Sequence, residues 1–418
     1  MSQLIITGPT RLEGEWQTGG SKNAVLPMLA ASLLCDGEIE FTNVPDLSDV
    51  TVMCQILESL GAVVKRNASH HTLSIDGRAV RSGSIDAQLS GKMRGSVLIL
   101  GAAAGRSGDI TIAQPGGDII GARPIASHLK AFQALGYEVT VSHQTTRVSG
   151  QAQGSRIVMG ELTVTGAENA IMAACLSSGE TELRMVAVEP HVVDFCHMLV
   201  RFGAQITGIG THNLSITGVD QMTGGNWRIP PDQLESGTIA IAAAATRGDV
   251  VVHDCMIDEH DALLTIFDEI GVHYEIMSPT SLHVKAGGDY QAVKVRTQPY
   301  PNFPSDLQTP LAVLLTQCEG TSEIFETLYE GRLQYLFELQ RMGASVAIRD
   351  AHTGMITGPT PLLGTELVSY DIRAGATMLL AGMIAEGTTV LDRIEHIDRG
   401  YERIDERLRE LGAQLKRV

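Results

Sequence analysis

A lysine at the start of an apolar stretch is the first residue whose position suggests chemistry. Lys22 lies in the segment GGSKN, residues 19–23. Leu26, Leu29 and Leu33 then recur at helical spacing, so we expect an amphipathic helix that begins near Lys22. The backbone N–H groups and the dipole at a helix N-terminus favour an anion. This segment therefore indicates a place for an anionic group, and a solvated surface lysine is the alternative.

A loop rich in glycine is the second such feature. Residues 114–125 read QPGGDIIGARPI, with Pro115 and Pro124 near the ends and Asp118 at the tip. Its three glycines give the middle of the loop conformational freedom, whereas the prolines restrict its ends. A loop of this kind suits a lid that closes over a substrate. A plain surface loop is the alternative.

An internal repeat supplies the elements that must position these residues. A glycine after a predicted helix recurs six times, at Gly61, Gly136, Gly203, Gly271, Gly343 and Gly412. The steps of 75, 67, 68, 72 and 69 residues indicate six copies of one unit. Each copy reads as strand–helix–strand–helix–strand–strand. Within a copy, the distance between the first-helix glycine and this glycine is 23 to 25 residues, except in the second copy, where it is 28. The extra length falls in the loop with Asp118, and a departure from a repeat often marks function.

The repeats predict an α/β protein of two domains. One copy cannot cover both its helices and its sheet, but three copies around shared buried helices can. Pro230 and Pro231 suit a linker between domains, and symmetry places a second crossover near Gly19–Gly20. We therefore predict an N-terminal three-repeat domain of residues 22–229, which carries the loop. Residues 1–21 and 230–418 would form the C-terminal three-repeat domain.

Composition narrows the class of protein. The 418 residues include 48 acidic and 31 basic ones, a net charge of −17, which argues against nucleic acid or an anionic membrane as the main partner. The six cysteines form no C-x-x-C pair and are expected to be buried, reduced thiols. The N-terminus lacks the pattern of a signal peptide, and no apolar run approaches the length of a membrane span. We expect a soluble, cytoplasmic protein whose oligomeric state the sequence does not give.

Six ordered motifs resemble a known family: GSKNAVLPMLAASLL, PGGDIIGARPI, VTGAENAIMAA, FPSDLQ, DIRAGATMLLAG and HIDRGYERI. From about residue 5 to the C-terminus the chain resembles the UDP-N-acetylglucosamine 1-carboxyvinyltransferases, the UDP-GlcNAc enolpyruvyl transferases. The resemblance implies two inside-out α/β barrel domains, each of three βαβαββ repeats, with the active site in the cleft between them. It agrees with the repeat count reached from the glycines.

The resemblance also implies a reaction. The enolpyruvyl group of phosphoenolpyruvate is joined to the 3-hydroxyl of UDP-GlcNAc and phosphate is released, through a tetrahedral adduct formed by addition and resolved by elimination. No metal or organic cofactor is implied, and no metalloprotease, P-loop or Rossmann motif occurs. The step is the first committed one of peptidoglycan synthesis, which links the chain to cell wall biogenesis, cell shape, the cell cycle and cell division.

Several cations would hold these anionic substrates. By resemblance, Lys22, Arg123 and Arg399 bind phosphoenolpyruvate, with Asn23 beside the reacting centre, and Arg332 and Arg373 hold the anionic groups. Without the resemblance each of these cations would more readily be interpreted as a solvated surface charge, and Lys22 is the mildest exception because it lies at a predicted helix N-terminus. The nucleotide sugar would be contacted by Arg94, Arg123, Pro124, Ile125, Ala126, Ser127, Thr163, Val164, Thr165 and Gly166, and by the backbone of Leu328.

Two carboxylates are implied in proton transfer from the sugar. Asp306, in Pro-Ser-Asp-Leu-Gln, resembles the residue that orients and deprotonates the 3-hydroxyl. A buried Asp among arginines ionises easily and can then accept a proton. Asp371, two residues before Arg373, is a second candidate for this work. A structural ion pair with the neighbouring arginines is an equally good interpretation of Asp371.

Asp118 departs from the family, because most relatives carry Cys at this position. The family assigns the residue as the general acid toward the methylene carbon of phosphoenolpyruvate. A carboxylic acid can donate this proton if desolvation raises its pKa, whereas nearby cations act in the opposite direction. Fosfomycin alkylates the Cys of relatives, and an Asp lacks the nucleophilicity of a thiolate. We therefore expect intrinsic resistance to fosfomycin.

Other departures leave alternatives open. Ala126-Ser127 stands where relatives usually have Asp-Leu, and Gly331 replaces a common Asn. A paralogous enolpyruvyl transferase with another sugar nucleotide is therefore one alternative. The sister enzyme that acts on shikimate 3-phosphate is another, although it should lack the PGG loop and the DRGYER tail. A catalytically inactive repeat scaffold is the third, against which the full set of site residues argues.

Overall fold

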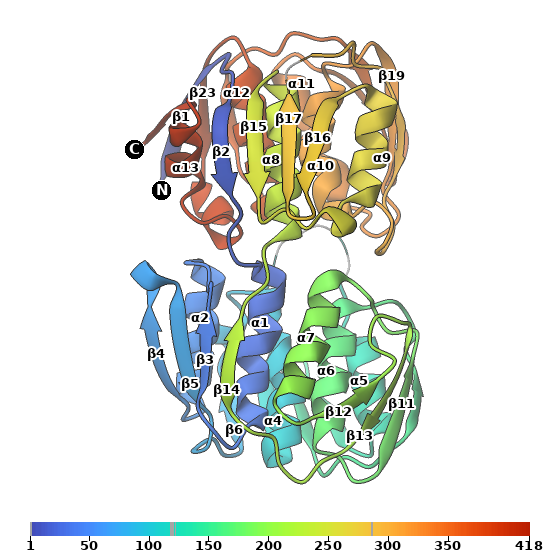
Figure 1. Ribbon diagram of the computed structural model, residues 1–418. Helices are drawn as coiled ribbons and strands as arrows, with labels where there is room; N and C mark the ends of the chain where they lie inside the picture. Colours follow the sequence, from blue (N-terminus) through green and yellow to red (C-terminus); the bar gives the residue numbers. More distant parts are fainter. Residues whose placement is uncertain (1, 118–120, 122, 286) are drawn as a thin grey trace. The chain divides into compact units, whose positions relative to one another are not determined.

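The chain forms two compact units in the computed structural model, which describes residues 2–117, 121, 123–285 and 287–418 (Figure 1). Unit 1 contains the N-terminal segment up to Gly19 together with Pro231–Val418. Unit 2 contains Gly20–Gly117 and Arg123–Pro230. Each unit has its own hydrophobic core, so each can be described separately.

Unit 2 is built around three helices: α1 (Lys22–Ala31), α4 (Ile99–Ser107) and α6 (Val164–Cys175). All residues from Ala24 to Ala31 are buried, and so are those from Gly166 to Cys175. A helix that is apolar on all sides is stable only when other elements cover it on all sides. Glycine allows α4 and α6 to approach closely, because a Cβ on Gly101 would lie 2.4 Å from the backbone oxygen of Asn169.

Three four-stranded sheets and three further helices surround these helices in unit 2 (Figure 1). In sheet order, the strands are β14 (Gly225–Arg228), β3 (Ile39–Thr42), β5 (Thr72–Asp76) and β4 (Val63–Asn67); β6 (Gly83–Ile85), β7 (Asp109–Ala113), β9 (Thr145–Ser149) and β8 (Glu138–Val141); and β10 (Arg156–Val158), β11 (Glu180–Arg184), β13 (Asn213–Thr217) and β12 (Gln205–Thr207). The outer helices are α2 (Ser48–Ser59), α5 (Ala126–Ala134) and α7 (Pro190–Arg201), and the short helices are α3 (Ala87–Ser90), η1 (Ser32–Leu34), η2 (Ala68–His70) and η3 (Arg94–Leu98).

Unit 1 repeats this plan. Its buried helices are α8 (Gln233–Ala245), α10 (Ser305–Leu315) and α12 (Ile372–Ile384), and its other helices are α9 (Asp261–Ile270), α11 (Tyr335–Arg341), α13 (Ile404–Glu410), η4 (Ile257–Glu259), η5 (Arg332–Gln334) and η6 (Ile394–Arg399). Its sheets are, in order, β16 (His273–Ser278), β17 (Ser281–Lys285), β15 (Asp249–His253) and β2 (Glu13–Gln17); β18 (Lys294–Arg296), β19 (Gly320–Phe325), β21 (Thr353–Gly358) and β20 (Ser345–Ile348); and β22 (Glu366–Val368), β23 (Gly387–Asp392), β1 (Gln3–Gly8) and β24 (Gln414–Arg417).

Each sheet has the same pattern of strand directions. One outer strand is parallel to its neighbour and the other pairings are antiparallel, as in β14–β3, β3–β5 and β5–β4. Three strands reach their sheet from far along the chain. β14 completes the first sheet of unit 2, whereas β1 and β2 each complete a sheet of unit 1. Three repeats with inner helices and outer sheets in each unit confirm the predicted inside-out α/β fold.

The glycines that revealed the repeat have a shared backbone conformation. Those after the second helix of each copy all have a positive φ, from 88° to 108°: Gly61, Gly136, Gly203, Gly271, Gly343 and Gly412. This left-handed conformation ends a helix and is strained for residues that carry a Cβ. Glycine therefore recurs at this position in every copy because the backbone there has a positive φ.

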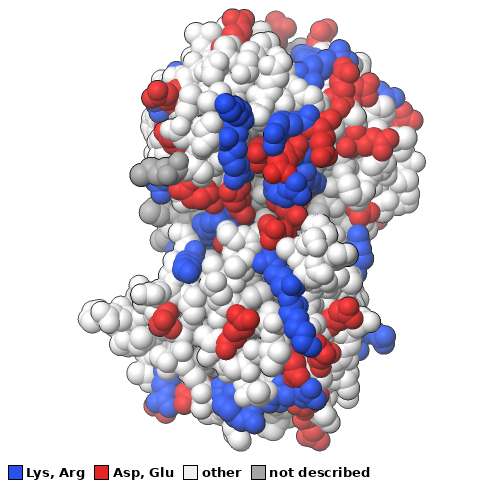
Figure 2. All heavy atoms as spheres, turned by 90° about the vertical axis from the view of Figure 1, so that its left-hand side faces the viewer, with Lys and Arg blue, Asp and Glu red and all other residues white. Residues whose placement is uncertain are grey.

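Surface charge and burial agree with the composition. On the face that Figure 2 draws, acidic and basic side chains are interspersed in both units. All six cysteines are buried and unpaired, as predicted for the buried thiols. Among the described residues, every helix is too short or too polar to span a bilayer.

Candidate active site

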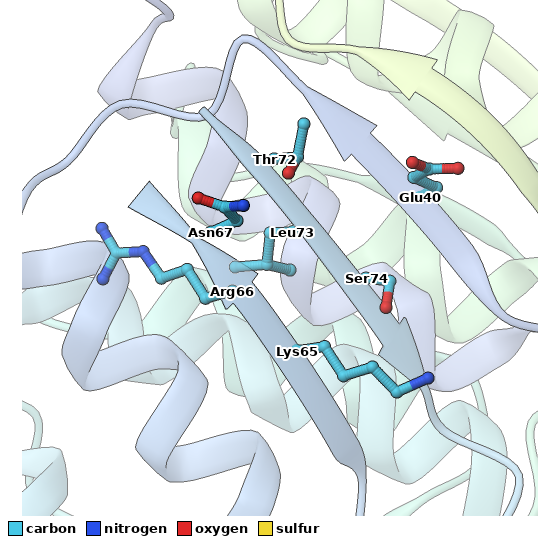
Figure 3. Close-up of a pocket in the computed structure, with 7 residues that line it drawn as sticks. All are labelled: Glu40, Lys65, Arg66, Asn67, Thr72, Leu73 and Ser74. Atoms are coloured by element: carbon cyan, nitrogen blue, oxygen red, sulfur yellow. The ribbon is translucent and has the colours of Figure 1, made fainter. Parts of the chain in front are cut away.

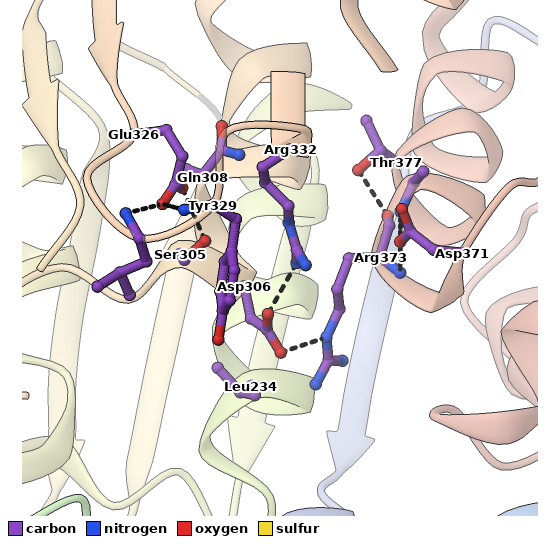
Figure 4. A network of polar contacts seen from close by, with 12 residues as sticks. Leu234, Ser305, Asp306, Gln308, Glu326, Tyr329, Arg332, Asp371, Arg373 and Thr377 are labelled. Carbon is purple, nitrogen blue, oxygen red and sulfur yellow. Dashed lines mark hydrogen bonds and ion pairs between the residues drawn. The ribbon is translucent and has the colours of Figure 1, made fainter. Parts of the chain in front are cut away.

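Asp306 lies between two arginines in unit 1 (Figure 4). Its Oδ1 accepts a hydrogen bond of 2.7 Å from Nη2 of Arg332, and its Oδ2 accepts one of 2.8 Å from Nε of Arg373. The side chains of Arg332 and Arg373 are 3% and 6% exposed, whereas that of Asp306 is 30% exposed. The carboxylate is thus held by two buried cations and is itself partly exposed.

Both arginines keep their charge. Burial lowers the pKa of Arg332, but Asp306 and Asp371 more than offset this, so its pKa lies above the ordinary value. Burial also lowers the pKa of Arg373, and Tyr401 and Asp306 raise it by more. Tyr401 is buried, its ring centroid lies 5.2 Å from the Arg373 guanidinium, and its hydroxyl is 3.0 Å from that of Thr238 on α8. This packing holds Arg373 in place against Asp306.

Asp371 has a structural role at the start of α12. Its Oδ1 accepts hydrogen bonds of 2.8 Å from the backbone N–H groups of Arg373 and Ala374, so Asp371 is the N-cap of the helix that carries Arg373. Its charge also raises the pKa of Arg332. Asp371 therefore caps the helix that carries Arg373, and its charge supports that of Arg332.

Glu326, which the sequence did not single out, fixes the predicted backbone contact at Leu328. The Oε1 of this buried residue accepts from the N–H groups of Leu328, at 2.8 Å, and Tyr329, at 3.2 Å. Its Oε2 accepts a 2.7 Å bond from the hydroxyl of Ser305, which lies next to Asp306 on α10. Glu326 thus fixes the backbone at Leu328 and links it to the start of α10.

The motif around Arg399 serves several contacts of unit 1. Arg399 is the last residue of η6, and Asp398 before it forms two hydrogen bonds of 2.8 Å with Arg417. A Cβ on Gly400 would lie 2.3 Å from a methyl carbon of Ile372, so only glycine permits this approach to α12. Glycine and tyrosine in DRGYER are therefore explained by packing against α12 and Arg373.

Lys22 lies where the sequence predicts it, as the first residue of α1. The hydroxyl of Ser21 caps the helix by accepting from the N–H of Ala24, at 3.3 Å. The Nζ of Lys22 lies 3.1 Å from Oδ2 of Asp49 on α2, and the two side chains are 12% and 5% exposed. Asp49 was not among the predicted site residues, and its carboxylate pairs with the ammonium group of Lys22.

The described part of the glycine-rich loop packs closely. A Cβ on Gly116 would lie 1.8 Å from the backbone oxygen of Gly91, and one on Gly117 would lie 2.9 Å from the Cβ of Arg94. Nη2 of Arg94 donates to the carbonyl oxygen of Pro124 at 3.4 Å, so Arg94 lies beside the C-terminal end of the loop. Gly116 and Gly117 therefore also serve packing. Asp118 lies outside the described residues.

The remaining predicted residues of unit 2 lie at the starts of two helices. Arg123, Pro124 and Ile125 precede α5, whose first residues are Ala126 and Ser127. Thr163 is the N-cap of α6, and Val164, Thr165 and Gly166 form its first turn. The two starts are linked, because the hydroxyl of Ser127 donates to Glu161 at 2.7 Å. The predicted nucleotide-sugar residues of this unit are thereby brought together around α5 and α6.

Glu168 on α6 carries a prediction about stability. It is 1% exposed, its Oε1 has no hydrogen-bond partner, and burial, with the charge of Glu189, raises its pKa well above the ordinary value. A raised pKa in the folded state gives stability that is present below the unfolded pKa and is lost as the pH rises. Glu168→Gln, which keeps the neutral shape, should therefore raise the thermal midpoint at pH 8, and the gain should shrink toward pH 5.

Exposed Glu138→Gln on β8 is the control for this prediction, since the side chain is at the surface. Thermal unfolding followed by circular dichroism at both pH values measures the effect. Equal midpoints for Glu168→Gln and the wild type at both pH values would show that Glu168 is not a neutral buried acid.

A shallow depression on unit 2 lies apart from these residues (Figure 3). It is lined by side chains of β3, β4 and β5: Glu40, Lys65, Arg66, Asn67, Thr72, Leu73 and Ser74. Its cations are paired, Lys65 with Glu38 at 3.3 Å and Arg66 with Asp46 at 2.7 Å. We interpret it as the polar outer surface of a sheet, because it contains none of the predicted site residues.

Comparison with known proteins decides the family. Residues 6–408 match the family model described as EPSP synthase (3-phosphoshikimate 1-carboxyvinyltransferase). A UDP-N-acetylglucosamine 1-carboxyvinyltransferase of Koribacter versatilis is 40% identical, over 100% of this chain and 97% of the relative. Proteins with that name from Desulforapulum autotrophicum and Halothermothrix orenii are each 39% identical over the full length of both chains. The chain belongs to the UDP-N-acetylglucosamine 1-carboxyvinyltransferase family.

Solved structures agree with this family at the level of the fold. The enolpyruvyl transferase NikO from Streptomyces tendae has a TM-score of 0.90 at 23% identity and covers 100% of this chain and 99% of its own. An EPSP synthase from Acinetobacter baumannii has a TM-score of 0.77 at 17% identity over the whole of both chains. This chain and these more distant proteins thus have a common architecture. Because the chain belongs to the UDP-N-acetylglucosamine 1-carboxyvinyltransferase family, it is a transferase.

Proposed function

We propose that this enzyme transfers the enolpyruvyl group of phosphoenolpyruvate to the 3-hydroxyl of UDP-N-acetylglucosamine and releases phosphate. The observation that carries the proposal is Asp306, a partly exposed carboxylate fixed by two buried arginines, in a chain 39–40% identical to enzymes of that name. The step belongs to peptidoglycan precursor synthesis, and it thereby contributes to cell wall formation, cell shape and cell division. The enzyme would act in the cytoplasm.

Asp306 would begin the reaction. Its carboxylate accepts the proton of the sugar 3-hydroxyl, and the hydroxyl oxygen then forms a bond to C2 of phosphoenolpyruvate. A proton added to C3 converts the methylene carbon into a methyl group and gives the tetrahedral adduct. Loss of a proton from that methyl group and cleavage of the bond between C2 and the phosphate oxygen then release phosphate. A fixed base acts without first being reoriented, which suits general base catalysis.

The cations would bind the two anionic substrates. Lys22 at the N-terminus of α1, with Asn23, and the predicted partners Arg123 and Arg399 hold phosphoenolpyruvate. Arg332 and Arg373 neutralise charge around Asp306. The starts of α5 and α6, with Arg94 and the carbonyl oxygen of Leu328, bind the nucleotide sugar.

Asp118 would supply the proton to the methylene carbon of phosphoenolpyruvate. Its carboxyl group replaces the thiol of most relatives in this role, so the enzyme should resist alkylation by fosfomycin. The proposed reaction requires no metal and no organic cofactor.

A phosphate-release assay tests the proposed function. The enzyme is incubated with phosphoenolpyruvate and, in parallel, with UDP-GlcNAc, UDP-GalNAc, UDP-glucose and shikimate 3-phosphate. Release with UDP-GlcNAc alone is the expected result. Faster release with another UDP-sugar would identify a paralog with a different acceptor, which the Ala126-Ser127 departure leaves open, and release only with shikimate 3-phosphate would overturn the proposal.

A further inference from the structure

A buried histidine on α5 contacts α6 in unit 2, next to the predicted nucleotide-sugar residues. His128 on α5 is 1% exposed. Its Nδ1 lies 2.9 Å from Nδ2 of Asn169 on α6, and its Nε2 lies 3.3 Å from the hydroxyl oxygen of Thr165 in the first turn of the same helix. Thr165 is half-buried. The imidazole ring therefore bridges a fully buried amide and a hydroxyl that is partly open.

The neighbours of Asn169 fix the orientation of its amide. The oxygen accepts a 2.6 Å hydrogen bond from the backbone N–H of Gly101 on α4, and a backbone N–H can only donate. The nitrogen donates at 3.0 Å to the carbonyl oxygen of Val97, which can only accept. Because Gly101 has no Cβ, α4 can approach Asn169 closely enough for this arrangement.

The amide in turn fixes the protonation of the ring. Since the amide nitrogen of Asn169 is a donor, Nδ1 of His128 must be the acceptor and cannot carry a proton. Burial, together with the charge of Arg94, lowers the pKa of His128 to about 3, so the ring is neutral and its single proton is on Nε2. Nε2 then donates to Thr165. The hydroxyl hydrogen of Thr165 consequently points away from His128.

We propose that His128 is a positioning residue that holds the Thr165 hydroxyl as a hydrogen-bond donor to an acceptor oxygen of the bound nucleotide sugar. This inference rests on the proposed function, because it takes UDP-GlcNAc as the ligand at the start of α6. It adds a specific role for Thr165, and it assigns roles to His128 and Asn169, which the sequence did not predict to be functional. The hydroxyl is oriented before the ligand arrives, so binding does not have to restrict its rotation.

Two substitutions of His128 separate positioning from packing. In His128→Gln the amide nitrogen can occupy the place of Nε2 and donate to Thr165. In His128→Asn the shorter amide can still accept from Asn169 but cannot reach Thr165. We expect His128→Asn and Thr165→Val each to raise KM for UDP-GlcNAc about five- to tenfold, the worth of one hydrogen bond, with a smaller change in kcat. His128→Gln should stay near the wild type, and KM for phosphoenolpyruvate should not change.

The double variant gives a further check. If His128 acts through Thr165, adding His128→Asn to Thr165→Val should cause no additional rise in KM. Additive effects, or equal losses in His128→Asn and His128→Gln, would overturn the proposal. Thermal unfolding of each variant shows whether it is folded.

A spectroscopic measurement keeps the proposal testable even if a variant does not fold. In the wild-type enzyme labelled with ¹⁵N-histidine, His128 should show a protonated Nε2 and an unprotonated Nδ1, unchanged from about pH 5.5 to pH 8. A proton on Nδ1, or titration in this range, would overturn the proposal. This spectrum requires no turnover, so it is separate from the phosphate-release assay, whose failure with UDP-GlcNAc would refute the proposed function instead.

Discussion

Asp306→Asn is expected to lower kcat by about 10²- to 10⁴-fold, the range for loss of a general acid or base. The amide has nearly the shape of the carboxylate and can still accept a hydrogen bond from Arg332 or Arg373. It cannot take the proton of the sugar hydroxyl. It also leaves the two buried guanidinium groups without the charge that now lies between them. Phosphate release at saturating concentrations of both substrates measures the change.

An aspartate with similar chemistry provides the control for Asp306→Asn. Asp109 on β7 also accepts two hydrogen bonds from arginine, at 2.9 and 3.0 Å from Arg147, but this pair lies on the surface of a sheet. Asp109→Asn should leave kcat within about twofold of the wild type, because exposed ion pairs contribute little. A value of kcat for Asp306→Asn within tenfold of the wild type, in a folded protein, would remove Asp306 from the proton transfer.

Fosfomycin is expected to leave the wild-type enzyme unmodified. The alkylation requires a thiolate, and the loop of this chain carries Asp118 instead of Cys. The six cysteines of the chain should not react with fosfomycin either, because all of them are buried and burial raises the pKa of each thiol. Mass spectrometry after incubation with fosfomycin and UDP-GlcNAc should therefore show the unmodified mass. A stoichiometric adduct would contradict the predicted resistance.

Asp118→Cys should reverse this result. We expect one fosfomycin adduct per chain, on the peptide that contains residue 118, and the buried cysteines should not contribute to the signal. The pH optimum should also move upward, since a thiol ordinarily titrates near pH 8.5 and a carboxyl group near pH 4. A pH–rate profile identical to that of the wild type would count against Asp118 as the acid. Asp118→Asn, which cannot donate the proton in the same way, should be strongly impaired.

The fold could be predicted from the sequence because the same local requirement recurs in every copy. A left-handed glycine ends each second helix, and the first helix of each copy is rich in apolar residues because other elements cover it on all sides. Both the glycine and the apolar helix recur at regular intervals, so they can be recognised in a single sequence. The start of α1 at Lys22 was predictable for a similar reason, since Ser21 caps the helix and the apolar pattern follows directly.

The supporting contacts of the site could not be predicted in this way. Glu326 reaches back to Ser305 on another element, and His128 meets Asn169 on a different helix, 41 residues further along the chain. Such partners have no fixed spacing and are set only when the helices pack. The motifs led only to a prediction of which residues meet a substrate. They did not indicate that Asp371 caps α12, or that Tyr401 packs against Arg373.

The pairing of β1 and β2 has a consequence for the order of folding during synthesis. β2 can pair with β15 only after β15, which begins at residue 249, has been made. β1 can pair with β23 and β24 only after these strands, which end at residues 392 and 417, have been made. Unit 2 has all of its strands once residue 228 has left the ribosome. It can therefore fold while both strands of the N-terminal segment are still unpaired. The sheet of unit 1 that contains β1 is complete only after β24 has been made and has paired with β1.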